Sequence, residues 1–174
     1  MQPLIDKAKN IRLAIFDVDG VLTTGALFYG KDKIEGKNFH VHDGQGIKSL
    51  QKSGVEIAVI TARTSDIVTW RMQDLGITHV YQGQTNKLIA YEALKQKLKL
   101  NDAQIAYAGD DLPDLSVLSR VGFSITVANA PLVIRQRVAW VTRKKGGKGA
   151  VREICDFIME AQGTLQKTIE AYLT

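Results

Sequence analysis

Carboxylate side chains gather at two places in this sequence, each directly after a short apolar run. Asp17 and Asp19 follow the first of these runs and precede Gly20. Side chains two positions apart in an extended chain point to the same side, so we expect these two carboxylates to face one region before the chain turns. Three more carboxylates follow a later apolar run, at Asp110, Asp111 and Asp114.

Five carboxylates in one pocket indicate a bound cation, because without one they repel each other strongly. Oxygen ligands without histidine or cysteine favour Mg²⁺, which shares its coordination shell with a substrate phosphate. A carboxylate in such a site can attack phosphorus and become an aspartyl-phosphate, which gives Asp17 the role of nucleophile. Asp19 is then placed to protonate the leaving oxygen and to deprotonate the attacking water.

These acidic residues permit two other interpretations. The Asp-x-Asp-Gly pattern also opens calcium-binding loops, but those loops carry a third ligand at the fifth position, where this chain has Val21. Thr61 after another apolar run and Lys87 in the next unit favour phosphoryl transfer instead. For Asp114, an interaction with the dipole of the helix that it begins stays open beside a supporting role at the metal.

Alternating apolar runs and helical patterns position these residues. Continuous apolar runs are typical of strands buried on both faces, so the alternation predicts a parallel sheet wrapped on both faces, a doubly wound α/β fold. In open sheets of this kind, ligands bind beyond the carboxyl ends of the strands. We expect strands at 11–18, 55–60, 78–81, 105–108, 123–127 and 138–141, and helices at 46–52, 65–75, 87–98, 112–121 and 131–137.

Two segments depart from the alternation. Residues 26–41 have strand-like ends around a Gly-Lys-Asp turn, which predicts a β-hairpin projecting from the sheet after its first strand. A long amphipathic helix from Val151, interrupted at Gly163, leaves a C-terminal tail at 163–174. With no repeat, linker or room for a cap, the sequence predicts a single cap-less domain over residues 1–174.

Composition excludes several function classes. Hydrophobic residues at 45% and charged residues at 24% are ordinary for a soluble globular protein. The net charge of +5 is scattered without a basic stripe and interleaved aromatics, so we expect no nucleic-acid partner. The single cysteine, Cys155, favours a reducing compartment, and no apolar run approaches membrane-spanning length, so we expect a cytoplasmic protein without a membrane partner.

Four motifs, in their order and strand contexts, resemble those of the haloacid dehalogenase superfamily: residues 17–23, 60–63, Lys87 and 109–114. The resemblance implies that Asp17 is nucleophile and metal ligand, and that Asp19 is the general acid/base and a metal ligand through its backbone carbonyl. Thr61 and Lys87 then hold the phosphate. The resemblance further implies that Asp110 completes the Mg²⁺ site and that Asp111 and Asp114 support it without binding the ion.

Three further segments, at residues 39–47, 75–83 and 146–153, resemble the 3-deoxy-D-manno-octulosonate 8-phosphate phosphatases. That group supplies the acidic sugar of lipopolysaccharide, lacks a cap and forms tetramers in which a neighbouring subunit covers the active site. The resemblance implies a small-molecule sugar-acid phosphate as substrate and a homotetramer as the assembly. Where the group usually has a basic residue in the first of these segments, this chain has His42.

A sugar acid carries a carboxylate as well as the phosphate, and a guanidinium group matches a carboxylate bidentately. The alternatives left open are a nonulosonate 9-phosphate phosphatase, a non-catalytic phosphatase-like interaction module, and a mutase or phosphotransferase, which would normally need a cap. The residues that we expect to contact the substrate are Asp19, His42, Asp43, Gly44, Lys48, Arg63, Arg71 and Lys87.

Overall fold

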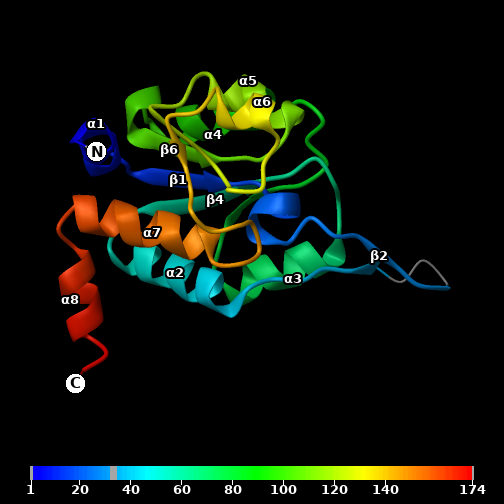
Figure 1. Cartoon of the computed structure of the whole chain (residues 1–174), viewed down its shortest axis with the longest axis horizontal. Helices are drawn as coiled ribbons and strands as arrows, with labels where there is room; N and C mark the ends of the chain where they lie inside the picture. Colours follow the sequence, from blue (N-terminus) through cyan, green and yellow to red (C-terminus); the bar gives the residue numbers. More distant parts are fainter. Residues whose placement is uncertain (1, 32–34, 174) are drawn as a thin grey trace.

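The centre of the protein is a six-stranded sheet, shown in Figure 1 in a computed structural model that describes residues 2–31 and 35–173. Its strands all run parallel, in the order β5-β4-β1-β6-β7-β8. The doubly wound parallel sheet predicted from the sequence is therefore confirmed. The strands are β1 (Leu13–Phe16), β4 (Glu56–Ile60), β5 (His79–Tyr81), β6 (Ile105–Ala108), β7 (Phe123–Thr126) and β8 (Trp140–Val141).

The strand β1 lies in the middle of the sheet because its side chains are all apolar and all buried. It pairs with β4 on one side and β6 on the other, and Phe16 is level with Val59 and Ala108. The segments that follow these three strands therefore leave the sheet at the same edge. This edge is where the sequence places its carboxylates.

Helices cover both faces of the sheet. In Figure 1, α4, α5 and α6 lie above the sheet, while α2, α3 and α7 lie below it, and α2 packs against α7. The helices are α1 (Gln2–Lys9), α2 (Val41–Lys52), α3 (Asp66–Asp74), α4 (Lys87–Leu98), α5 (Leu115–Leu118), α6 (Leu132–Arg135), α7 (Ala150–Ala161) and α8 (Leu165–Glu170).

The predicted hairpin is present between β1 and α2. Its strands β2 (Phe28–Tyr29) and β3 (Glu35–Gly36) are short and antiparallel, and the hairpin projects from the body of the molecule at the right of Figure 1. The predicted turn at Gly30-Lys31-Asp32 lies partly outside the described residues. At the other end of the chain, Gly163 has φ +71° and separates α7 from α8, as the sequence predicts.

Three local predictions differ from the structure. The helix expected from residue 46 begins at Val41, so the end of the predicted hairpin segment is already helical. The helix expected at 112–121 is a 3₁₀ turn at Leu112–Asp114 followed by the single-turn α5. The sequence reading missed α1 entirely. Among the described residues, no helix has the length and apolar character needed to cross a bilayer.

Candidate active site

A pocket of about 290 Å³ opens at the carboxyl ends of β1, β4 and β6. The Asp17 N–H donates to the Ala108 carbonyl at 2.9 Å, which ties the loop after β1 to the end of β6. The structure thereby brings together residues from all four sequence motifs. The lining residues are Asp17, Asp19, Gly25, Thr61, Ala62, Arg63, Lys87, Asp110, Asp111, Pro113 and Asp114.

Three carboxylates crowd the floor of this pocket. Asp17, Asp110 and Asp114 each place a carboxylate oxygen within 4.8 Å of the other two. Burial, with Asp114 adding to it, raises the pKa of Asp17 to about 6, and burial together with Asp17 and Asp114 raises the pKa of Asp110 to about 7. The raised pKa values show that the negative charges of these carboxylates destabilise one another. A bound cation would therefore stabilise their ionised forms. Oxygen donors fit Mg²⁺ in particular.

Lys87 supplies one cation at the cluster. It is the first residue of α4, whose start is fixed by the Asn86 side chain accepting from the Leu88 N–H at 3.2 Å. Its Nζ lies 2.9 Å from Asp17 Oδ1 and 2.6 Å from Asp114 Oδ1. Burial alone would lower the pKa of Lys87, but the two carboxylates outweigh burial and raise it. The ammonium group therefore stays charged beside Asp17.

Asp114 holds the site together. Its side chain is almost fully buried, and its Oδ1 accepts from Lys87 Nζ at 2.6 Å and from the Tyr107 hydroxyl at 2.6 Å. Its Oδ2 accepts from the backbone N–H groups of Asp110 and Asp111 at 2.9 and 3.0 Å. Because both oxygens are already used, Asp114 orients Lys87 and the Asp110 loop rather than offering free lone pairs to a metal. Sequence reasoning missed Tyr107, which lies inside an apolar strand.

The loop after β1 is held in place by a distant glycine pair. Gly20 has φ +91°, and a Cβ on Gly20 would lie 2.0 Å from Asp110 Oδ2. A Cβ on Gly146 would lie 1.7 Å from the Gly20 carbonyl oxygen, and the Gly147 N–H donates to the Val21 carbonyl at 3.0 Å. Only glycine therefore fits at these points of contact. The sequence marks the 146–153 segment only through the family resemblance, and its contact with the loop after β1 is visible only in the structure.

Asp19 lines the same pocket, and its carboxylate pairs with a residue of the hairpin and with Arg63. Its Oδ1 accepts from Lys37 Nζ at 2.6 Å, and its Oδ2 lies 3.8 Å from Arg63 Nε. Arg63 is partly exposed at the mouth of the pocket and donates to Glu35 Oε1 at 3.2 Å. Sequence reasoning missed both Lys37 and Glu35, since neither falls in a recognised motif.

The remaining predicted substrate residues do not line this pocket. The Asp43 carboxylate is buried and accepts from the backbone N–H groups of Gly149 and Arg152, so it caps the start of α7. Arg71 lies over the Phe39 ring, with 5.7 Å from its guanidinium carbon to the ring centroid. The other three members of this group lie on α2: His42, Gly44 and Lys48. Their role as substrate contacts stays a prediction.

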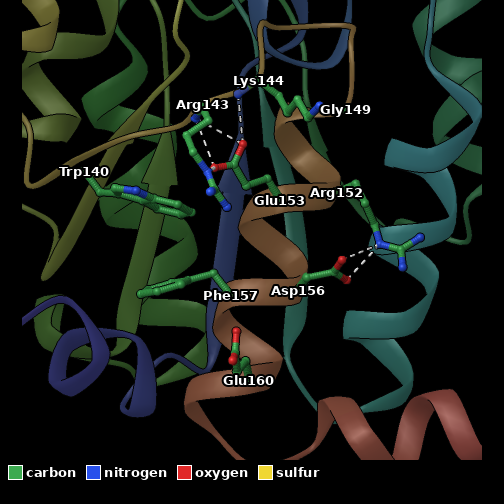
Figure 2. Close-up of a pocket in the computed structure, with 9 residues that line it drawn as sticks. All are labelled: Trp140, Arg143, Lys144, Gly149, Arg152, Glu153, Asp156, Phe157 and Glu160. Atoms are coloured by element: carbon green, nitrogen blue, oxygen red, sulfur yellow. Dashed lines mark hydrogen bonds and ion pairs between the residues drawn. The ribbon is translucent and has the colours of Figure 1, made fainter. Parts of the chain in front are cut away.

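A larger hollow than the one around Asp17 lies elsewhere in the described part of the chain. Figure 2 shows this groove of about 910 Å³, which runs along α7 beside Trp140 and Phe157. Several of its charged side chains are paired within the groove: Glu153 accepts from the Arg143 and Lys144 backbone N–H groups, and Arg152 pairs with Asp156 at 2.8 Å. It carries no cluster comparable with the one around Asp17.

Comparison with known proteins places this geometry in context. A family model described as haloacid dehalogenase-like hydrolase matches residues 64–154. The 3-deoxy-D-manno-octulosonate 8-phosphate phosphatase KdsC of Escherichia coli (strain K12) is 49% identical over 94% of this chain and 87% of its own length.

Two solved structures are similar throughout. A protein described as a probable YrbI-family phosphatase, from Pseudomonas syringae pv. phaseolica, has a TM-score of 0.98 and 47% identity, over 100% of this chain and 99% of its own. The 3-deoxy-D-manno-octulosonate 8-phosphate phosphatase of Moraxella catarrhalis, in complex with magnesium ion, phosphate ion and KDO, has a TM-score of 0.97 and 42% identity, over 99% of each chain.

Proposed function

Because this chain belongs to the haloacid dehalogenase-like hydrolase family, we propose that it hydrolyses 3-deoxy-D-manno-octulosonate 8-phosphate to the free sugar acid and phosphate. The observation that carries the proposal is the buried Asp17, paired with Lys87 and next to Asp110 at the end of β1. A relative of similar sequence and fold holds magnesium, phosphate and the product sugar acid. We assign the reaction to the cytoplasmic supply of this sugar acid for lipopolysaccharide.

Asp17 acts as the nucleophile in this proposal. Its carboxylate oxygen forms a bond to phosphorus while the bond from phosphorus to the sugar oxygen breaks, and Asp19 gives a proton to that leaving oxygen. Water then attacks the phosphorus, Asp19 takes the proton from this water, and the Asp17–phosphorus bond breaks to release phosphate. Lys87 and Thr61 lie beside Asp17 and bind the phosphate oxygens, with Lys87 offsetting their charge.

Asp17 and Asp110, with the backbone carbonyl of Asp19, would hold Mg²⁺. When bound, the ion supplies positive charge that lets a carboxylate approach an anionic phosphate. The raised pKa values of Asp17 and Asp110 support this assignment, because the two carboxylates lie where they need a compensating cation. Asp111 and Asp114 support the loop that carries Asp110. Asp114 does so by accepting hydrogen bonds from the backbone N–H groups of Asp110 and Asp111.

We also propose that the active site is completed between subunits of a homotetramer. The hairpin leaves Leu27, Phe28 and Tyr29 between 44% and 65% exposed, an apolar surface that a partner would cover. Arg63 stands at the mouth of the pocket, whereas His42, Lys48 and Arg71 lie away from it. These three would reach the sugar-acid carboxylate of a substrate bound in a neighbouring subunit. A fully active monomer in sedimentation and dilution experiments would contradict the shared pocket.

The substrate is tested by turnover of the purified chain with Mg²⁺ against three phosphate esters. These are the eight-carbon sugar acid, the nine-carbon nonulosonate and a neutral hexose phosphate. We expect kcat/KM to be highest for the eight-carbon acid and turnover to stop with a strong chelator. Preference for the nine-carbon acid would replace the substrate while keeping the reaction. Absence of turnover on all three esters would overturn the proposed function in favour of a non-catalytic module.

A further inference from the structure

Lys37 is a partly exposed residue beside the active site whose side chain is buried. It follows β3 on the hairpin, and its side chain is only 1% exposed. A buried ammonium group needs a carboxylate partner, because the loss of hydration is otherwise very costly. Its Nζ donates to Asp19 Oδ1 at 2.6 Å and lies 3.2 Å from Glu35 Oε1. The hairpin thus directs a fixed positive charge at the carboxylate that the proposed reaction uses for proton transfer.

We propose that Lys37 is a positioning residue that holds the Asp19 carboxylate in place for proton transfer, so that the hairpin takes part in setting the geometry of the reaction. This inference rests on the proposed phosphatase function. Lys37 lies outside the recognised motifs, and the inference gives this residue a function in catalysis that it performs through Asp19. Lys37 is not required to contact the substrate.

The contacts around Asp19 form a ring of alternating charge. Asp19 pairs with Lys37, Lys37 with Glu35, and Glu35 with Arg63 at 3.2 Å, while Arg63 Nε returns to within 3.8 Å of Asp19. Two members come from the hairpin, one from the loop after β1 and one from the loop after β4. Each charged group in the ring has an oppositely charged group on both sides. Asp19 is therefore held from two directions.

Asp19 depends on such contacts because its own loop does little to fix it. The backbone at Asp19 is extended, Gly20 follows it, and the side chain keeps 22% of its surface exposed. The described structure gives its carboxylate oxygens no other ion pair or hydrogen bond than those with Lys37 and Arg63. Proton transfer requires the carboxylate within hydrogen-bond reach of the reacting oxygen. Without Lys37, the side chain is free to change rotamer and leave that position.

A double-mutant cycle tests the proposal on the full chain with Mg²⁺ and the phosphate ester that the wild-type protein turns over. The variants are Lys37→Met, Lys37→Arg, Asp19→Asn and the double variant Lys37→Met/Asp19→Asn. We expect Lys37→Met to lower kcat about 10- to 100-fold, as for a misplaced catalytic group, with KM within about twofold of wild type. Lys37→Arg should restore part of kcat. The matched control is Lys97→Met, at an exposed position on α4.

The decisive result is the effect of Lys37→Met in the Asp19→Asn background. If Lys37 acts through Asp19, the double variant has the same kcat as Asp19→Asn alone. If the two losses multiply, Lys37 affects the fold or another group and the proposal is overturned. A rise in KM with kcat unchanged overturns it as well, since Lys37 would then bind substrate. Lack of turnover by the wild-type protein would instead refute the proposed function, so the two failures are distinct.

Discussion

The largest single effect that we expect on stability comes from replacing Asp114 by Asn. The Asp114 carboxylate accepts four hydrogen bonds in a nearly fully buried site, two on each oxygen. An Asn side chain has only one acceptor oxygen, and its NH₂ group faces two donors whichever way it turns. With the NH₂ group toward the backbone, the N–H groups of Asp110 and Asp111 both lose their acceptor. With the NH₂ group toward the other two donors, the Tyr107 hydroxyl can turn and accept from it, whereas Lys87 keeps only Asp17. The substitution therefore leaves one or two donors of the site without the acceptor that they have in the wild type.

The size of the effect follows from the number of these donors. Each unsatisfied buried donor costs about 1–3 kcal/mol, so with one or two of them the free energy of unfolding should fall by about 1–6 kcal/mol. We expect a value in the lower half of this range, because losing the Asp114 charge also relieves the repulsion that helps to raise the pKa values of Asp17 and Asp110. For a chain of this size, about 2–4 °C of melting temperature corresponds to each kcal/mol.

The assay is chemical denaturation of the metal-free protein in chelator, followed by circular dichroism. The matched control is Asp111→Asn, because the exposed Asp111 carboxylate accepts only from backbone N–H groups of its own turn, that of Leu112 at 2.8 Å and that of Asp114, and Asn caps such a turn about as well. We expect that control to stay within about 0.5 kcal/mol of wild type. Tyr107→Phe removes one hydrogen bond to the charged Asp114, so it should lower the free energy of unfolding by about 1.5–3 kcal/mol. Asp114→Asn with the stability of its control would refute the reasoning.

Three further outcomes are expected. Asp17→Asn should keep the circular dichroism spectrum and lose essentially all phosphate release, because an amide cannot form the phosphoenzyme. In the metal-free protein, the raised pKa values of Asp17 (about 6) and Asp110 (about 7) add stability below pH 4 that is lost as the pH rises through 6 and 7. Thermal melts should therefore show this loss, weakened in Asp110→Asn, and a larger Mg²⁺-induced shift at pH 8 than at pH 5.5. Gly146→Ala should lower both melting temperature and turnover, because its Cβ would overlap the Gly20 carbonyl oxygen, and a normal melt would contradict that contact.

The sheet and its catalytic edge could be predicted because their signals are local in the sequence. Each central strand is a continuous apolar run, and parallel strands end at one edge, so Asp17 and Asp110 had to come close. The first helix, α1, was missed because its amphipathic pattern spans barely two turns before the first strand. The predicted start of α2 is too late because the predicted hairpin extends to Val41 and the helical pattern becomes clear only from Gly46.

Contacts between residues far apart in the chain cannot be read from a local sequence pattern. Tyr107 is an apolar-run residue by pattern, and only the packed structure directs its hydroxyl at Asp114. By its sequence Lys37 is an exposed hairpin lysine, and only the structure shows that its Nζ donates to Asp19. Asp43 was included among the substrate contacts through its motif, whereas the structure places its carboxylate at the start of α7. In each case tertiary packing decides which partner the side chain meets.

The glycine contact on the loop after β1 has a consequence for synthesis of the protein on the ribosome. The nucleophile Asp17 emerges early, but the segment that packs on its loop, at Gly146 and Gly147, is made much later. At the usual speeds of translation, about 10 s separate the two. A nascent chain therefore carries its nucleophile for that time on a loop that is not yet held in place. Because a late segment finishes the site, a ribosome-bound fragment that stops before it should not consume the substrate.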